Sequence, residues 1–314
     1  MRHALEPEND DPVLNAHPRL TVQQGPYTYT VETKDNHSTY TVTDGKDTMT
    51  LPLRWIFGQN SQTWVLENDG HLYESMVSYF KRDQALATTP GDQRITPHTV
   101  TEAMGRRLST WEVFECFNCH ASGARAGEKL KPEALRPGVD CERCHIGALQ
   151  HMDDAAHDNF KTIPPKLRPM DARESANFCG QCHRTWDTVI RNHWKGAVDV
   201  RFQPYRLESA KCFIGTDRRI SCLACHDPHQ PVNHDDAYYD SKCQACHAPA
   251  KIAAVSSTTA ASSTSAVLPL FKVCPVSKDK CVSCHMPKVE QPGGHSVFTD
   301  HLIRAVKPGE PYPD

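Results

Sequence analysis

The sequence predicts a mostly irregular fold with short α-helices and a small antiparallel β-region near the N-terminus. Only 38% of the 314 residues are hydrophobic, which is too few for a conventional aliphatic core in a chain of this length. The chain contains 14 cysteines and 18 histidines, residue types that serve as metal ligands or redox groups. Apolar and polar residues alternate between about residues 20 and 80. Something other than aliphatic side chains must therefore fill much of the interior.

The β-region is predicted from the segments TYTVET and STYTVTDG. Their apolar residues fall on one parity, at Tyr29, Val31, Tyr40 and Val42. Asp44-Gly45 and Asp69-Gly70 supply the residues that favour tight turns between such runs. A small antiparallel sheet follows from this pattern.

Twelve of the cysteines belong to six copies of the pattern Cys-x-x-Cys-His. The copies are Cys116/Cys119/His120, Cys141/Cys144/His145, Cys179/Cys182/His183, Cys222/Cys225/His226, Cys243/Cys246/His247 and Cys281/Cys284/His285. This pattern is the attachment signature of c-type haem. Two thiols separated by two residues can form thioethers with the two vinyl groups of one porphyrin, and the next histidine then lies beneath the iron as its proximal ligand. The sequence therefore predicts six covalently bound haem c groups, with the short helices packed around them.

An isolated Cys-x-x-Cys pair more often forms a structural zinc site or a disulfide. Here a histidine follows each of the six pairs, which favours haem over both alternatives. Because c-type haem is attached outside the cytoplasm, the chain is predicted to be periplasmic or extracellular. The opening residues MRHALEPENDDP lack the order of a signal peptide, and no apolar stretch approaches the length of a membrane span. We therefore expect a mature chain or a start site placed downstream of the natural one.

Helix signals begin at about residue 100. Ser109 with Glu112 forms a capping-box pattern before the first haem motif, and Asp171 with Glu174 forms another before the third. These patterns predict short helices that lead into the motifs.

Two regions are predicted along the chain. Residues 1–98 form a haem-free N-terminal region with the small sheet, and residues 99–314 form a hexahaem cytochrome domain. Within the second region, about residues 253–266 (AAVSSTTAASSTSA) are small and uncharged and predict a flexible surface loop. Cys212 and Cys274 lie outside the motifs, and the sequence leaves open whether they form a disulfide or remain free thiols.

The histidines outside the motifs are candidates for the sixth position on each iron. They number 12 and are His3, His17, His37, His71, His98, His151, His157, His193, His229, His234, His295 and His301. Iron with two histidine ligands suits electron transfer, whereas an open sixth position suits ligand binding or catalysis. These histidines are more than enough to give each of the six irons a second histidine ligand.

Four of these histidines are the first candidates for distal ligands, namely His151, His229, His295 and His301. The first two follow the proximal histidines of their own motifs too closely to reach the opposite face of the same porphyrin, so we predict that they ligate neighbouring haems. The last two follow the sixth motif and are free to fold back onto earlier haems. His157 and His71 are further candidates, followed by His193, His98 and His3. A distal methionine is not favoured, because Met286 directly follows a proximal histidine.

Most of the chain, from about Pro26 to His301, resembles the multihaem cytochromes related to the tetrahaem electron acceptor of hydroxylamine oxidoreductase, and is most similar to the branch often fused to tetratricopeptide repeats. The segments that carry the resemblance are GVDCERCHIGALQH, FCGQCHRTW, VRFQPYRLESAKC, SCLACHDPH and CPVSKDKCVSCHMPKVEQPGGHSVFTDHLIR. The resemblance implies closely packed haem pairs, ligation by motif and non-motif histidines, and periplasmic electron transfer. It implies ligand roles for His151, His229, His295 and His301. It also raises the hypothesis that a signal peptide and a seventh haem motif precede Met1, with His3 as the distal ligand of that haem.

The leading functional interpretation is an extracytoplasmic hexahaem electron carrier with bis-histidine haems and no catalytic side chain. One alternative is a haem-dependent oxidoreductase of nitrogen compounds, with one open haem that acts on nitrite or hydroxylamine. Another is a subunit of a conductive cytochrome filament. Such self-assembly is not favoured, because it predicts a shortage of histidines and this chain has a surplus.

The charge of the chain indicates the kind of partner. The formal net charge is −3, and each haem adds about −1 when its two propionates are counted against the positive ferric porphyrin core. We therefore expect redox partner proteins with a basic docking face, whose binding weakens with salt. No phosphate-binding glycine loop, nucleic-acid-binding patch or transmembrane segment is found in the sequence.

Overall fold

An antiparallel sheet occupies most of the first 107 residues. The computed structural model describes residues 1, 3–7, 11–59, 61–123, 125–126, 129–131, 134–163, 166–247, 274–307 and 309–313. The loop predicted at about residues 253–266 lies outside these described residues.

The chain divides into two compact units. The first unit contains Met1–Arg168 and Pro292–Ser296, and the second contains Pro169–Gln291 and Val297–Asp314. These units are defined by packing, whereas the predicted boundary at residue 98 separates haem-free from haem-bearing sequence. That predicted boundary remains a prediction. The first unit contains the sheet together with the first two haem motifs, and the second unit contains the other four motifs.

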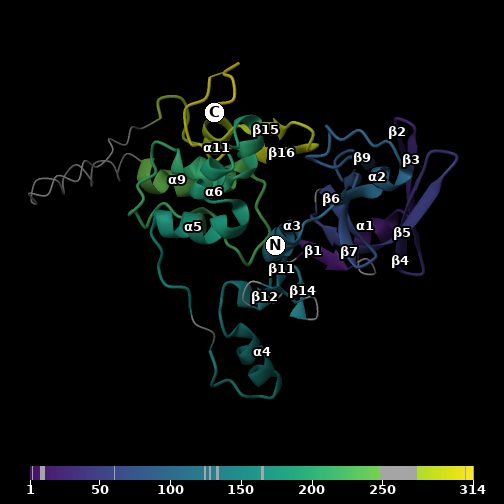
Figure 1. Cartoon of the computed structure of the whole chain (residues 1–314). Helices are drawn as coiled ribbons and strands as arrows, with labels where there is room; N and C mark the ends of the chain where they lie inside the picture. Colours follow the sequence, from purple (N-terminus) through teal and green to yellow (C-terminus); the bar gives the residue numbers. More distant parts are fainter. Residues whose placement is uncertain are drawn as a thin grey trace, which may run out of the picture. The chain divides into compact units, whose positions relative to one another are not determined.

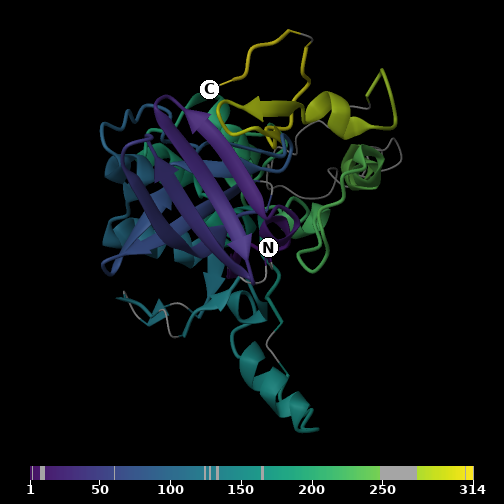
Figure 2. The same ribbon diagram turned by 90° about the vertical axis from the view of Figure 1, so that its right-hand side faces the viewer.

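The sheet of the first unit has ten strands, and its described strand pairs are antiparallel (Figures 1 and 2). Its main path runs in the order β10-β7-β6-β5-β4-β3-β2, β1 pairs with β5, and β8 joins β6 to β9. The strands are β1 Leu5–Pro7, β2 Arg19–Gln24, β3 Tyr27–Lys34, β4 His37–Thr43, β5 Thr48–Phe57, β6 Ser61–Asn68, β7 His71–Ser75, β8 Val77–Phe80, β9 Ala85–Thr88 and β10 Gly105–Arg107. Consecutive strands are joined mostly by short turns, so the sheet is a meander over most of its length.

The alternation read from the sequence correctly predicted the buried face of β3 and β4. Their side chains at Tyr29, Val31, Tyr40 and Val42 are all buried in the main core cluster. Asp69 and Gly70 both have positive φ and join β6 to β7, as the two-residue turn requires. Asp44-Gly45 lies in the turn between β4 and β5, where the Asp44 carboxylate accepts hydrogen bonds from two backbone N–H groups. The period-two pattern therefore fixes which face of the sheet packs inward.

The prediction of a small sheet was wrong in size. The sheet extends to ten strands because later segments also pair, although they do not alternate strictly. Strand β8 is buried at all four positions, and β6 has three consecutive buried residues. A strand covered on both faces shows no period-two signal, so alternation alone does not reveal it.

Short helices make up the rest of the regular structure in the first unit. They are α1 Pro12–Ala16, α2 Val100–Met104, α3 Thr110–His120, the 3₁₀-helix η3 Cys141–Arg143 and α4 Ala148–Ala156. Two small ladders accompany them, one of β11 Ala121–Ser122 with β14 Arg136–Pro137 and one of β12 Arg125–Ala126 with β13 Lys129–Leu130. The prediction of short helices beside an antiparallel sheet is thus correct at this level.

The second unit is built from short helices and one hairpin. Its helices are α5 Ala172–His183, α6 Trp186–Arg191, η4 Gly196–Arg201, α7 Gln203–Glu208, α8 Cys222–Cys225, η5 Asp236–Tyr239, α9 Asp240–His247 and α11 Cys281–His285. β15 Lys288–Gln291 pairs with β16 Ser296–Thr299, whose first residue belongs to the first unit. Among the described residues, no helix has the length and apolar character needed to cross a bilayer.

Both predicted capping boxes are present. The Ser109 hydroxyl accepts from the Glu112 N–H at 3.2 Å, and Glu112 accepts from the Ser109 N–H at 2.9 Å. Asp171 and Glu174 make the equivalent reciprocal bonds at the start of α5. The two longest motif-bearing helices therefore begin where the sequence predicts.

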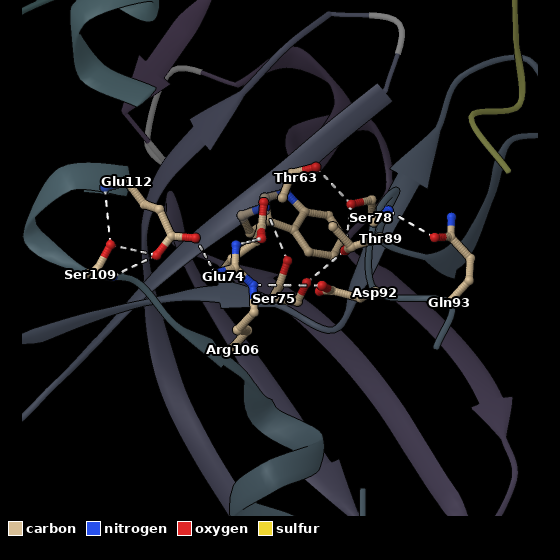
Figure 3. Close-up of polar contacts among 12 residues, drawn as sticks. Thr63, Glu74, Ser75, Ser78, Thr89, Asp92, Gln93, Arg106, Ser109 and Glu112 are labelled. Atoms are coloured by element: carbon tan, nitrogen blue, oxygen red, sulfur yellow. Dashed lines mark hydrogen bonds and ion pairs between the residues drawn. The ribbon is translucent and has the colours of Figure 1, made fainter. Parts of the chain in front are cut away.

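Arg106 connects the sheet to the start of α3 (Figure 3). Its guanidinium donates to Glu74 of β7 at 2.7 Å and to Glu112, and it lies 3.7 Å from Asp92. Hydrogen bonds from Ser109 and the charge of Arg106 hold the pKa of Glu112 at about 2. Burial of Asp92, reinforced by the charge of Glu74, raises its pKa to about 6. One arginine thus holds three carboxyl groups at the base of the first motif helix.

The raised pKa of Asp92 predicts a pH dependence of stability. Between about pH 4 and pH 6 the folded protein holds more protons at this carboxyl than the unfolded chain, so the free energy of unfolding should fall as the pH rises through this window. In the wild type this loss of unfolding free energy should be on the order of 2 kcal/mol, and Asp92→Asn should abolish it. The measurement is the urea midpoint of the holoprotein between pH 4 and pH 7, with the exposed Asp47→Asn as control. If the urea midpoints of the wild type and Asp92→Asn changed with pH in the same way, the Asp92 carboxyl would not titrate in this window.

Candidate haem sites

Each haem motif lies in or next to a short helical turn. Positions i, i+3 and i+4 share a face of a helix, so both thiols and the imidazole project together where the helix includes the histidine, whereas His226 follows its turn in an extended conformation. The backbone N–H of His145 donates to the Cys141 carbonyl at 2.7 Å, and that of His226 donates to the Cys222 carbonyl at 2.8 Å. The helices α3, α5, α9 and α11 end at the motif histidine itself. Local backbone geometry therefore presents the groups that haem c attachment requires.

The second cysteine of every motif lies in or directly after the last helical turn before the proximal histidine. Cys119 belongs to α3, Cys182 to α5, Cys225 to α8, Cys246 to α9 and Cys284 to α11, while Cys144 directly follows η3. Cys119, Cys144, Cys182 and Cys246 are half-buried, and Cys225 and Cys284 are exposed. Of the first cysteines, Cys141 is exposed, and Cys116, Cys179, Cys222, Cys243 and Cys281 are half-buried.

None of these 12 thiols is fully enclosed by protein, so each has a side open to a porphyrin. The structure agrees with the sequence on where the motif cysteines lie, but it does not test the thioether bonds. Attachment at each of the six motifs therefore remains a prediction.

No disulfide joins the cysteines, all 14 of which lie in the described part of the chain. This includes Cys212 and Cys274, so the structure gives no support to a disulfide between those two. Among the described residues, no three His, Cys, Asp or Glu side chains gather into a metal-binding cluster. The donor set in each motif is two thiols and one imidazole, which fits haem c.

The first motif packs on the sheet. Phe117 of α3 is buried against Trp55 and Phe57 of β5, with ring centres 5.9 and 5.2 Å apart. The His120 ring lies 5.1 Å from the Phe57 ring, and its Nδ1 lies 2.7 Å from the Ala4 carbonyl oxygen. Because a carbonyl only accepts, this contact places the proton on Nδ1 and leaves the lone pair of Nε2 for a metal.

The first and second motifs are joined through residues that lie between the two cysteines of each motif. The guanidinium of Arg143, between the two cysteines of the second motif, donates to Asn118 in the first motif. The bonds go to the Asn118 backbone carbonyl at 2.7 Å and to its side-chain oxygen at 3.1 Å. This contact ties the two motifs of the first unit together.

The third and fourth motifs are joined in a similar way. Ser175 of α5 is fully buried, and its hydroxyl accepts from the backbone N–H of Cys222 at 3.0 Å. The Cys222 thiol lies beside Cys179, and this neighbour lowers the pKa of Cys222. The first cysteines of these two motifs are therefore neighbours.

The fifth and sixth motifs form the third such pair. The Asp240 carboxylate at the start of α9 accepts from the backbone N–H groups of Lys280 and Cys281 at 2.7 and 2.8 Å. The thiols of Cys243 and Cys281 are neighbours that influence each other's pKa. In the sixth motif, His285 Nδ1 lies 3.0 Å from the Arg304 carbonyl oxygen, so its Nε2 is left for a metal. All six motifs thus come in three consecutive pairs.

A cavity of about 250 Å³ opens beside the third motif. Its lining residues are Cys182, His183, Arg184, Trp194, Arg201 and Phe202. The Trp194 and Phe202 rings lie 5.0 Å apart, and the Arg184 guanidinium lies over Trp194 at 5.5 Å. Although Arg201 reaches solvent through the opening, desolvation by the surrounding protein and the charge of Arg184 lower its pKa. Aromatic walls suit the face of a porphyrin and paired guanidinium groups suit its carboxylates, so the residues that line the cavity are chemically compatible with the edge of a haem.

His301 is placed opposite a proximal histidine of the second unit. Its ring centre lies 6.1 Å from that of His226, with 34° between the ring planes. His301 Nδ1 lies 3.0 Å from the Thr299 carbonyl oxygen. The residue is half-exposed by surface area, yet the protein atoms crowded around its ring lower its pKa to about 4, with a further contribution from His226. His301 is therefore a neutral imidazole, which is the form that binds metals.

The other predicted distal histidine of the second unit, His229, is exposed. Its Nδ1 lies 3.1 Å from the Asp227 carboxylate, a partner that orients the ring. His193 and His234 are exposed residues of the same unit. The structure does not test their ligand roles, which remain predictions.

The predicted distal histidines of the first unit have varied surroundings. His151 on α4 is half-buried with Nδ1 against the Thr162 carbonyl, and His157 at the end of that helix is exposed with Nδ1 2.8 Å from the Asp153 carbonyl. The His295 ring packs on Phe80 at 4.4 Å and contacts Asp83. His71 contacts the Arg107 guanidinium at 2.9 Å. Of these, His151 and His157 have the carbonyl partner that is typical of metal-bound histidine.

Comparison with known proteins identifies part of the chain. Residues 75–146 match the family described as cytochrome c554 and c-prime, a multihaem cytochrome c family. This segment is a cytochrome c554-family domain. Within these residues the match confirms the resemblance to multihaem cytochromes inferred from the sequence, and it implies covalent haem c and an extracytoplasmic location in general. No curated protein and no solved structure matches the chain.

The matched segment includes the first two haem motifs and the contact of Arg106 with Glu112 at the start of α3, whereas Glu74 lies one residue before it. Residues that join the motifs were missed by the sequence analysis, because a lone serine, aspartate or arginine carries no pattern. They are Asn118, Arg143, Ser175 and Asp240, and the cavity residues Arg184 and Arg201 were missed as well. Their only signal is position, since each lies within a motif, just before or directly after one, or beside an aromatic residue.

The buried hydroxyl of Ser175 predicts a measurable contribution to stability. Ser175→Ala removes the acceptor for the Cys222 N–H, and loss of a partner for a buried donor costs about 1–2 kcal/mol. Urea unfolding of the holoprotein should show this decrease. Ser209→Ala, which alters a hydroxyl outside the motifs of the same unit, should change the midpoint little. Equal midpoints for the two variants would show that the bond between the two motifs is not stabilising.

Proposed function

We propose that this protein is an extracytoplasmic hexahaem electron carrier whose irons are ligated by histidine on both sides. The observation that carries the proposal is the arrangement of the six motifs as three consecutive pairs, each held by direct hydrogen bonds. Bound haem supplies one-electron redox chemistry at each iron. The c554-family domain supports the same class of function.

The paired motifs suit electron transfer because neighbouring motifs bring their cofactors close together. Cys179 contacts Cys222, and Cys243 contacts Cys281, so the attachment points within each of these pairs are adjacent. Attachment points this near leave little polypeptide between the porphyrins they hold. Short separations of this kind favour transfer along a series of haems.

The orientation of the histidines suits closed irons. His120 and His285 among the proximal residues, and His151 and His301 among the distal candidates, have Nδ1 against a backbone carbonyl. Each such contact fixes the tautomer in which Nε2 can bind iron. A closed iron exchanges electrons with little rearrangement and offers no position for a substrate.

The proposed partner is a redox protein with a basic docking face. The polypeptide has a formal charge of −3, and bound haems make the holoprotein more acidic by about −1 each. Association should therefore weaken as the salt concentration rises.

The test is to purify the holoprotein and record its intact mass with its paramagnetic resonance and visible spectra. We expect the mass of six haems and six low-spin signals, because each iron has two imidazole ligands. Nitrite or hydroxylamine added to the oxidised protein, and carbon monoxide added to the reduced protein, should leave the spectra unchanged.

Other outcomes distinguish the alternatives. A high-spin signal from about one haem in six that shifts when nitrite is added would replace the carrier with an open-haem oxidoreductase. Ordered filaments seen by electron microscopy would favour a structural subunit. Fewer than six haems in a correctly matured protein would reject the hexahaem proposal.

A further inference from the structure

A buried ion pair lies directly beside His301 in the second unit. Asp300 is completely buried and Arg206 is 2% exposed. The Arg206 Nε lies 2.9 Å from one Asp300 oxygen, and its Nη2 lies 3.0 Å from the other. We propose that this ion pair positions His301 as the second axial ligand of the iron held by His226, an inference that rests on the proposed function.

The spacing of the two imidazoles points to a shared iron. Two imidazoles that bind one first-row metal from opposite sides, through metal–nitrogen bonds of about 2.0–2.1 Å, have ring centres roughly 6 Å apart. The ring centres of His226 and His301 are 6.1 Å apart. The contact between His301 Nδ1 and the Thr299 carbonyl leaves Nε2 as the nitrogen that binds.

Asp300 fixes the backbone from which His301 projects. Its N–H donates to the Pro287 carbonyl at 2.9 Å, and one of its carboxylate oxygens accepts from the Leu302 N–H at 3.0 Å. The second oxygen accepts from Arg304 Nη1 at 2.9 Å. The residue that precedes His301 and the residue that follows it are therefore held through the same buried carboxylate.

Arg206 is itself held from the other side. Its guanidinium lies 4.6 Å from the centre of the Tyr312 ring, and its Nη1 donates to the Pro313 carbonyl at 3.2 Å. The two-bond pair with Asp300 fixes direction as well as distance. A buried ion pair adds little net stability over an apolar replacement but can specify one arrangement, and here the arrangement specified is that of His301.

The same segment also reaches the sixth motif. The Arg304 carbonyl accepts from His285 Nδ1 at 3.0 Å, and the Arg304 N–H donates to the His285 carbonyl at 3.2 Å. The carboxylate of Asp300 thus links the ligand facing His226 with the residue that orients His285. A change at Asp300 should affect His301 first, because that residue is adjacent.

The first experiment tests the ligand. His301→Ala in the six-haem protein should convert one haem in six from low-spin to high-spin, and added imidazole should restore the low-spin signal. His37→Ala, which removes an exposed histidine of the β-sheet, should leave all six haems low-spin. If His301→Ala retains six low-spin haems, the ligand assignment is wrong although the hexahaem proposal stands.

A variant that lacks the fourth haem identifies which iron His301 ligates. Cys222→Ala with Cys225→Ala removes the attachment of the fourth haem and should leave five. Adding His301→Ala to that background should create no new high-spin signal, because the iron it serves is absent. A new high-spin signal there would assign His301 to a different haem.

The positioning role is tested at the ion pair. Asp300→Asn and Arg206→Lys should each make the same haem partly high-spin and imidazole-responsive, because His301 is present but no longer held. Asp217→Asn, which breaks the ion pair with the exposed Arg219 in the same unit, should not. If Asp300→Asn yields no folded holoprotein, Arg206→Lys decides. A lower melting temperature with all six haems still low-spin would overturn the positioning role.

Discussion

The contact between a histidine Nδ1 and a backbone carbonyl orients several of the candidate haem-ligating histidines. A carbonyl oxygen can only accept, so the contact fixes both the tautomer and the direction of the ring. His120 uses the Ala4 carbonyl, His285 uses the Arg304 carbonyl and His301 uses the Thr299 carbonyl. For the two proximal histidines the acceptor comes from a segment outside the motif. The Cys-x-x-Cys-His turn therefore provides the ligands, and the surrounding fold aims them.

The pairing of motifs follows from the shortness of their helices. A motif helix of four or five residues, such as α8 or α11, cannot be stable alone in water. Each of these helices begins against a polar side chain of the preceding motif helix, Ser175 for α8 and Asp240 for α11. Under the proposed function, the neighbour that satisfies the backbone is also the one that would hold the adjacent cofactor, so local stability and electron transfer would favour the same arrangement.

Local signals in the sequence were enough for part of the fold. Alternation located the buried faces of β3 and β4, and reciprocal cap residues located the starts of α3 and α5. The extent of the sheet was underestimated because β8, buried at every position, has no period of two. The partner of His301 could not be predicted, since it lies 75 positions after His226 and only tertiary packing brings the two rings to 6.1 Å.

The histidines outside the motifs are unequally divided between the two units. The first unit holds two motifs and eight other histidines, whereas the second holds four motifs and four others, His193, His229, His234 and His301. The surplus is therefore confined to the first unit. If the second unit closed its four proposed irons from its own residues alone, it would need all four of these histidines. The proposed function therefore makes His193 and His234 candidates beside His229 and His301, and the placement of His301 by a buried ion pair accords with so limited a supply.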